Sequence, residues 1–188
     1  MKRILGFVGS PKRDGNTGIL MQRFMKGVAE AGGESKIHWL NMLKVTPCQA
    51  CGYCQTHDRC VINDDLTPIL LEIPKADGIV IGSPVYFFQV SAQTKALIDR
   101  FYSLLNPDFT HRLGAGKPLA MIYCQGNPER LTFESYFGLT ARALKTVGMK
   151  LELSLVAPGL PEHGTVLQRP ELLEEAQAMG RKMIEGCK

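Results

Sequence analysis

The chain has 188 residues, of which 45% are hydrophobic and 21% are charged, and its formal net charge at neutral pH is +4. This composition suits one folded domain with a sizeable core and argues against disorder, and no segment repeats at a solenoid period. Nucleic-acid binding is disfavoured, because the basic residues do not spread along one face with aromatic residues between them.

The start of the sequence lacks the pattern of a secretory signal, because Met1-Lys2-Arg3 is followed by only five apolar residues, 4–8. No apolar run approaches the roughly 20 residues that a transmembrane helix needs. We therefore expect a cytoplasmic protein with no membrane partner. Six cysteines in such a protein argue against a disulfide framework and favour metal or redox chemistry.

Strand and helix patterns alternate along the chain, which predicts a parallel, doubly wound α/β sheet with helices on both faces. The expected strands lie at 4–8, 35–40, 78–83, 119–123 and 149–156, and the expected helices lie around 20–28, at 66–73, at 91–105, at 131–147 and from Pro170 onward. The continuous apolar runs of 4–8, 78–83 and 119–123 suit the sheet centre. The strict alternation that begins 149–156 suits an edge strand.

The first strand ends in a polar turn, Gly-Ser-Pro-Lys-Arg-Asp-Gly-Asn-Thr at 9–17, which opens a helix. Free backbone amides, the helix dipole, the hydroxyls of Ser10 and Thr17 and the cations Lys12 and Arg13 predict a site for a small anion, best a terminal phosphate. The turn contains neither G-x-x-x-x-G-K-[ST] nor G-x-G-x-x-G, so neither a nucleoside triphosphate nor a dinucleotide is favoured. A plain strand-to-helix loop capped by Asn16 or Thr17 is the alternative.

The third strand runs into an unusual loop, Ser-Pro-Val-Tyr-Phe-Phe-Gln at 83–89. Three adjacent aromatic residues cannot all be core, and an aromatic wall beside free amides suits a flat ligand with polar edges, such as an isoalloxazine. The alternative is that Phe87 and Phe88 pack against the sheet edge or a subunit interface.

Both loops resemble those of the NAD(P)H-dependent FMN reductase and iron-sulfur flavoprotein families. The resemblance is carried by Ser-Pro-Lys at 10–12 with Asn16-Thr17, and by Gly-Ser-Pro-Val-Tyr-Phe at 82–87 with the segment 91–100, and it covers residues 1 to about 105. It implies a single flavodoxin-like FMN-binding domain over 1–188, with a cysteine-rich loop at about 42–63. It also implies a five-stranded parallel sheet in the order 2-1-3-4-5.

The resemblance further implies which residues contact FMN, and it assigns no side chain as a catalytic group, because the flavin carries the chemistry. The phosphate would be held by Ser10, Lys12, Asn16, Thr17 and Gly18. The ring and ribityl chain would be lined by Pro84, Val85, Tyr86 and Phe87, with Gln125 and Gly126 on the other side of the ring. Cys124 is interpreted as a small buried residue, and Glu162 and His163 as loop.

Four cysteines follow the pattern C-x2-C-x2-C-x5-C: Cys48, Cys51, Cys54 and Cys60. A 4Fe-4S cluster needs four thiolates that converge from different directions, and this compact spacing allows it. The run resembles that of the iron-sulfur flavoproteins, where it binds one 4Fe-4S cluster beside the flavin. One alternative is a four-cysteine zinc knuckle. The other is a site without metal, left as thiols or a labile disulfide, which purification in air favours. His57, inside the run, is interpreted as a surface residue.

The function implied is an FMN-dependent oxidoreductase, an electron-transfer iron-sulfur flavoprotein that passes electrons between a reduced carrier, ferredoxin or NAD(P)H, and a small-molecule acceptor. Flavin can exchange two electrons or one, whereas a cluster exchanges only one. Flavin and cluster together would therefore pass electrons between two-electron and one-electron partners. One alternative is a cluster-free NAD(P)H-dependent FMN, quinone or nitro-group reductase. A second is a zinc-stabilised nucleotide-binding protein without turnover. The resemblance also implies a homodimer or homotetramer.

Overall fold

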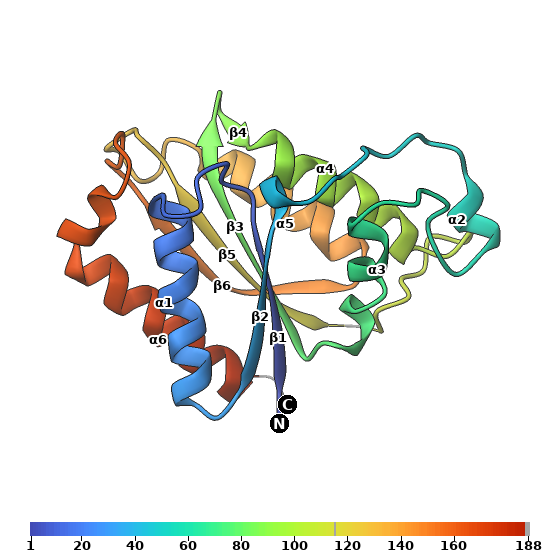
Figure 1. Ribbon diagram of the computed structural model, residues 1–188, viewed down its shortest axis with the longest axis horizontal. Helices are drawn as coiled ribbons and strands as arrows, with labels where there is room; N and C mark the ends of the chain where they lie inside the picture. Colours follow the sequence, from blue (N-terminus) through green and yellow to red (C-terminus); the bar gives the residue numbers. More distant parts are fainter. Residues whose placement is uncertain (115, 187–188) are drawn as a thin grey trace.

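The computed structural model describes residues 1–114 and 116–186 and has a central sheet of parallel strands covered by helices on both faces (Figure 1). The parallel strands follow the order β2-β1-β3-β5-β6, and the short β4 pairs with the end of β3 in antiparallel fashion. The strands are β1 (Arg3–Val8), β2 (Glu34–Trp39), β3 (Gly78–Tyr86), β4 (Gln89–Val90), β5 (Lys117–Cys124) and β6 (Met149–Ala157). The helices are α1 (Asn16–Glu30), α2 (Tyr53–Thr56), α3 (Leu66–Leu70), α4 (Ala92–Arg100), α5 (Glu134–Thr146) and α6 (Pro170–Gly186). Short 3₁₀ helices are η1 (Leu40–Met42), η2 (Ile73–Lys75), η3 (Phe101–Leu104) and η4 (Thr165–Gln168).

Each face of the sheet has its own apolar layer, and the central strands supply both. In β1, Leu5 and Phe7 pack in the layer beneath α3, α4 and α5, whereas Ile4 and Val8 pack in the layer beneath α1 and α6. Figure 1 shows these two groups of helices on opposite sides of the sheet. Burial on both faces explains why the central strands are continuously apolar, and β6 lies at one edge, as its alternation predicts.

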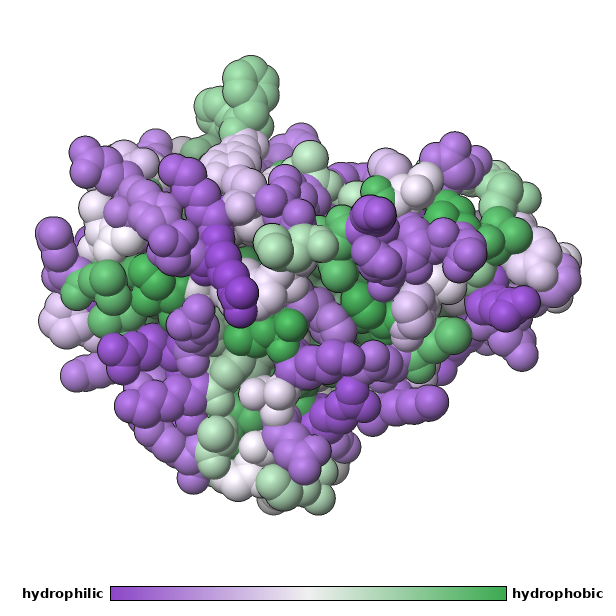
Figure 2. Space-filling model, viewed as in Figure 1, coloured by the Kyte–Doolittle hydropathy of each residue, from purple (hydrophilic) through white to green (hydrophobic). Residues whose placement is uncertain are grey.

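The predicted parallel, doubly wound arrangement is confirmed, but the predicted count of five strands is wrong because the sheet contains a sixth, β4. The strand β3 continues beyond Ser83 to Tyr86, and the chain then reverses through Phe87 and Phe88, whose φ angles are 46° and 72°. This reversal brings Gln89–Val90 back against the end of β3. The hairpin forms a hydrophobic projection in the space-filling view (Figure 2).

Helix positions agree with the expected segments, but several boundaries differ. The segment 66–73 is divided between α3 and η2, and α5 begins at Glu134 because 130–133 form turns. The predicted cap of α4 is confirmed: the Ser91 Oγ accepts a hydrogen bond of 3.3 Å from the amide of Thr94. Among residues 1–114 and 116–186, we find no helix long and apolar enough to cross a membrane.

Candidate functional site

A cavity of about 410 Å³ opens where β1, β3 and β5 end. The strand order reverses here, because β2 lies on one side of β1 and β3 lies on the other. In open α/β sheets this reversal of strand order is where ligands bind, and the volume lies within the range of ligand sites. The residues that line the cavity are Ser10, Lys12, Gly15, Asn16, Thr17, Pro84, Val85, Tyr86, Cys124, Gly126, Leu160, Pro161, Glu162 and His163.

The loop 9–17 forms one wall and is organised around the buried hydroxyl of Ser10. This hydroxyl accepts a hydrogen bond of 3.2 Å from the amide of Lys12 and donates one of 3.0 Å to its carbonyl. Gly15 is the N-cap of α1 and offers no side-chain acceptor to the first helical turn. The first turn of α1 therefore has no capping side chain, and Gly15, Asn16 and Thr17 line the cavity, which suits binding of an anion there.

The two cations of this loop have different surroundings. Lys12 is exposed and lines the cavity. The guanidinium of Arg13 lies over the Trp39 ring, 5.2 Å from its centre, and Arg13 does not line the cavity. A cation over an aromatic face is attracted by the ring, so Lys12 is the cation of the pair that borders the cavity.

Gly18 lies behind the loop rather than in the cavity wall. A β-carbon built on Gly18 would lie 2.1 Å from the carbonyl oxygen of Arg13 and 3.0 Å from the Trp39 ring. The absence of a side chain thus allows α1 to pack directly under its own N-terminal loop. The role that the structure gives to Gly18 is support of the loop.

The third-strand loop supplies Pro84, Val85 and Tyr86 to the cavity wall but directs Phe87 away from it. Phe87 is 97% exposed, and Phe88 packs edge-on against Phe133 at 5.4 Å between ring centres. The geometry therefore favours Tyr86 over Phe87 as the aromatic contact within one chain.

The loop after β5 contributes Gly126 to the cavity, together with the thiol-bearing Cys124. The side chain of Gln125 is turned into its own loop, where its Nε2 donates to the carbonyls of Asn127 and Glu129 at 3.1 and 2.7 Å. Burial raises the pKa of Cys124 to about 12, although a hydrogen bond with Thr17 opposes the shift. Cys124 is therefore a neutral thiol in the wall, in agreement with its interpretation as a small buried residue.

Residues 160–163 complete the cavity, and sequence reasoning missed them. The Asn16 amide Nδ2 donates to the carbonyls of Glu162 and Leu160 at 2.7 and 3.4 Å, and its Oδ1 accepts from the amide of Val166 at 3.1 Å. His163 Nε2 lies 2.9 Å from an Asp14 carboxylate oxygen. Because these partners are about 150 positions apart, no local sequence signal could have indicated the contact.

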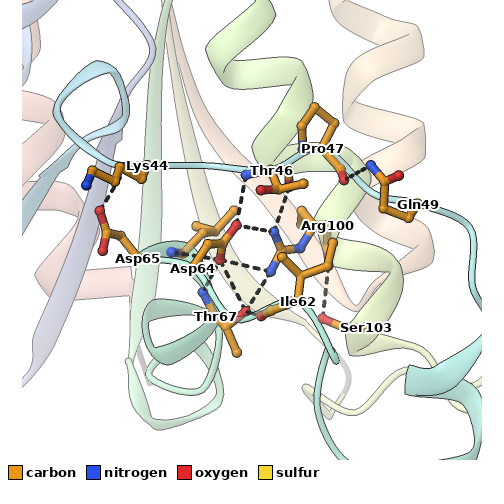
Figure 3. Close-up of polar contacts among 11 residues, drawn as sticks. Lys44, Thr46, Pro47, Gln49, Ile62, Asp64, Asp65, Thr67, Arg100 and Ser103 are labelled. Carbon is orange, nitrogen blue, oxygen red and sulfur yellow. Dashed lines mark hydrogen bonds and ion pairs between the residues drawn. The ribbon is translucent and has the colours of Figure 1, made fainter.

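The cysteine-rich loop leaves the sheet after η1 and returns at α3, and a buried ion pair holds its two ends together (Figure 3). Arg100, at the end of α4, donates to both carboxylate oxygens of Asp64 at 2.7 and 3.2 Å, to the Thr46 carbonyl at 2.7 Å and to the Thr67 hydroxyl at 2.7 Å. The side chains of Arg100 and Asp64 are 0% and 4% exposed. Thr46 precedes the first cysteine of the run and Asp64 follows the last.

The charges of this pair stabilise each other. Burial alone would raise the pKa of Asp64, but hydrogen bonds from Arg100 and from the amides of Thr46 and Thr67 outweigh it and hold the pKa below its ordinary value. Burial would likewise lower the pKa of Arg100, but Asp64, together with the nearby Cys60, raises it above its ordinary value. Both side chains are therefore charged at neutral pH.

The four predicted cysteine ligands lie on this loop with different exposures. Cys54 is buried, Cys48 and Cys60 are half-buried, and Cys51 is exposed. Between Cys48 and Cys54 the backbone reverses through two left-handed residues, Ala50 at φ 52° and Gly52 at φ 71°. Within the described ranges, no three His, Cys, Asp or Glu side chains gather closely enough to hold a metal ion. The donor set suits iron-sulfur chemistry, whereas the convergence of the four thiols stays a prediction.

The fold and the cavity define a flavodoxin-like α/β protein with a ligand site of mononucleotide size at the topological switch point. Residues 2–133 match the family described as NADPH-dependent FMN reductase, and the chain belongs to that family.

Curated relatives carry the description iron-sulfur flavoprotein. One from Methanocaldococcus jannaschii is 42% identical over 98 residues, which are 52% of this chain and 51% of that protein. One from Methanosarcina thermophila is 32% identical over 133 residues, 71% of this chain and 70% of the relative. The chain thus spans about half the length of the first relative and more of the second.

Solved structures support the fold. An NAD(P)H:quinone oxidoreductase from Methanothermobacter marburgensis superimposes with a TM-score of 0.71 at 17% identity, covering 97% of this chain and 96% of that one. An FMN-dependent NADH-azoreductase from Bacillus anthracis gives a TM-score of 0.68 at 15% identity, covering 98% of each chain. At these identities the likeness establishes the flavodoxin-like architecture alone.

Proposed function

We propose that residues 1–188 form one FMN-binding domain of a flavin-dependent oxidoreductase. The observation that carries the proposal is the cavity at the switch point, where a phosphate-type loop and the loop after β3 meet. Bound FMN would supply exchange between two-electron and one-electron partners. The relatives named as flavoproteins and the family match add support.

The phosphate would lie against the loop 9–17 and the amides of the first turn of α1. Lys12 offers charge and Thr17 offers a hydroxyl to this end of the cavity, whereas Ser10 would hold the shape of the loop, because its hydroxyl bonds to the backbone of Lys12. Asn16 serves indirectly by holding the 160–163 segment in place, and Gly18 serves by letting the loop lie close to α1.

The ring and ribityl chain would lie along Pro84, Val85 and Tyr86, with Gly126 opposite. Leu160 and Pro161 add apolar wall that excludes water from this part of the cavity. Gln125 would be a positioning residue that shapes the loop around Gly126, since its side chain bonds to that loop. Phe87 would act only as an exposed aromatic beside the mouth.

We further propose that Cys48, Cys51, Cys54 and Cys60 ligate a 4Fe-4S cluster, which makes the protein an electron-transfer iron-sulfur flavoprotein. The donor set and the names of the relatives support this assignment. The proposed donor is a reduced ferredoxin-like carrier or NAD(P)H, the proposed acceptor is a small molecule, and the proposed setting is a homodimer or homotetramer in the cytoplasm. A cluster-free reductase of quinones, nitro groups or FMN is the second candidate, and the description of the matching family, NADPH-dependent FMN reductase, supports it.

The deciding experiment is to determine FMN, iron and acid-labile sulfide per chain, with a visible spectrum, on protein purified without oxygen. About four irons and one FMN would support the electron-transfer function. FMN without iron would select the cluster-free reductase. A chain that binds no FMN at any concentration would overturn the proposed function altogether.

Lys12→Ala is expected to weaken FMN binding by about tenfold to a hundredfold, because it removes a charge-assisted hydrogen bond to the phosphate. Quenching of flavin fluorescence during titration of the apoprotein measures the effect. The matched control is Arg13→Ala in the same loop, which should change FMN affinity far less because that side chain lies over Trp39. Equal losses in both variants would remove Lys12 from its assigned role.

Cys54→Ala is expected to abolish stable iron incorporation, because a 4Fe-4S cluster that lacks one of its four thiolate ligands is bound less stably. FMN content should stay near one per chain. Iron analysis and absorbance near the cluster bands measure the result. Cys124→Ala serves as the matched control, since that thiol lines the cavity at the switch point and is not on the cysteine-rich loop, so iron content should be unchanged. Full iron content in the Cys54 variant would exclude this residue from the ligand set.

A further inference from the structure

The 160–163 segment brings one ionisable side chain to the cavity that the proposed function does not yet use. His163 lines the cavity, and its side chain is 38% exposed, so it lies at the cavity rim. Its Nε2 is 2.9 Å from a carboxylate oxygen of Asp14, which belongs to the loop 9–17. His163 and Lys12 therefore border the same end of the cavity from opposite ends of the chain.

The segment is held there independently of this ion pair. Asn16 bonds to the carbonyls of Leu160 and Glu162 and to the amide of Val166, which ties both sides of His163 to the start of α1. The backbone on both sides of His163 is thus held by neutral hydrogen bonds. The Asp14 carboxylate, 2.9 Å from Nε2, can then orient the His163 ring and stabilise its protonated form.

The charges around His163 are few and can be named. Asp14 and Lys12 lie on the facing loop, Glu162 precedes His163 and lines the cavity, and Arg13 is turned toward Trp39. Lys12 lies near the Asp14 carboxylate, whose pKa its charge helps to lower, and Glu162 adds a second carboxylate to the lining, so a phosphate dianion would need further positive charge. A protonated imidazole can provide it.

We infer that His163, oriented by Asp14, is a second cationic contact for the flavin phosphate, so that the site discriminates FMN from riboflavin most strongly at mildly acidic pH. This inference rests on the proposed FMN site. The hydrogen bond from His163 is the largest influence that lowers the pKa of Asp14, so the carboxylate keeps its charge wherever histidine titrates. Asp14 accepts from Nε2, so in the protonated ring the Nδ1–H is the donor available to a ligand.

The sign of the pH effect follows from the charge of the imidazole. The protonated ring attracts the phosphate, so FMN affinity should fall as pH rises through the range in which histidine loses its proton, about pH 5 to 8. The phosphate of FMN changes its own charge near about pH 6, so the comparison is best made between about pH 6.5 and about pH 8.5. Riboflavin lacks the phosphate and should show little change over this interval.

The test is to measure dissociation constants of FMN and riboflavin at both pH values for the wild type, His163→Gln and His163→Lys. We expect the wild type to bind FMN about threefold to tenfold more tightly at the lower pH. His163→Gln should lose this pH dependence without changing riboflavin affinity, and His163→Lys should keep the FMN preference at both values. His57→Gln, an exposed histidine on the cysteine loop, is the matched control.

Two outcomes would overturn the inference while leaving the proposed function intact. One is a His163→Gln protein whose FMN affinity keeps the wild-type pH dependence. The other is an equal loss of FMN and riboflavin affinity, which would mean that His163 only closes the wall. If the wild type bound neither flavin, the proposed function itself would fail, so the two failures are distinguishable.

Discussion

Asp64→Asn should lower the free energy of unfolding by about 3–5 kcal/mol, the cost of leaving one member of a buried ion pair without its counter-charge. The substitution keeps the shape of the side chain but leaves the guanidinium of Arg100 charged and fully buried. Because Arg100 also binds the Thr46 carbonyl, both ends of the cysteine-rich loop should loosen. Chemical denaturation measures the loss, and limited proteolysis of the native protein should show earlier cleavage between residues 46 and 64.

The matched control for this prediction is Asp99→Asn, which breaks the exposed pair between Lys95 and Asp99 on the same helix, α4. Those side chains are 55% and 42% exposed, so the loss should be no more than about 0.5 kcal/mol. A loss below about 1 kcal/mol for Asp64→Asn would contradict the view that the pair stabilises the loop.

The same pair predicts a dependence of stability on pH. The pKa of Asp64 is lower in the folded protein than in the unfolded chain, so its contribution is complete above the unfolded value of about 3.9. It is lost as pH falls below that value through the folded pKa. The wild type should therefore lose more stability than Asp64→Asn when both are compared between about pH 5 and about pH 2.

The elements that were predicted best from the sequence are those whose burial follows from a local pattern of apolar and polar residues. The strands β1, β3 and β5 have apolar central runs that are buried on both faces, and the alternating sequence of β6 lies at an edge. A register shift between β5 and β6, however, places Met149 and Leu155 in different apolar layers, which the alternation did not indicate. Ser91 at the start of α4 is a local signal as well, because an N-cap bonds within its own turn. Local patterns of this kind need no knowledge of the rest of the chain.

The features that were missed depend on backbone geometry or on distant partners. The hairpin of β3 and β4 turns at Phe87 and Phe88, two bulky residues with positive φ, where sequence rules expect glycine or asparagine. The bonds from Asn16 and Asp14 to the 160–166 segment join the two ends of the chain. Residues 160–163 are seen to line the cavity only once β6 and α6 are placed on the sheet.

Predicted roles were refined where a residue has a stronger local partner than the expected ligand. Asn16 was expected at the phosphate, but its amide is already committed to the 160–166 segment. Gln125 was expected beside the ring, but it bonds to the carbonyls of its own loop. In both cases the polar side chain bonds to backbone groups of a nearby loop, and for the buried Gln125 leaving those groups without partners would cost about 1–3 kcal/mol each.

Gly18→Ala should weaken FMN binding at least tenfold and lower the free energy of unfolding by about 1–3 kcal/mol, although alanine is the better helix former. Intrinsic propensity alone would favour the substitution by about 1 kcal/mol. The added β-carbon, however, would lie 2.1 Å from the Arg13 carbonyl oxygen, and this atom belongs to the backbone of the loop 9–17. The loop must therefore move away from the start of α1, which takes Lys12 and Ser10 out of register with the first-turn amides.

Gly138→Ala in α5 provides the matched control, because it makes the same chemical change in a helix where a β-carbon would meet nothing within 4 Å. That variant should gain up to about 1 kcal/mol of stability and bind FMN as the wild type does. Denaturation midpoints and flavin titrations of the two variants separate propensity from the close contact. If Gly18→Ala also gained stability and kept its FMN affinity, the loop could relax without cost, and close packing under the loop would not be what holds the phosphate site together.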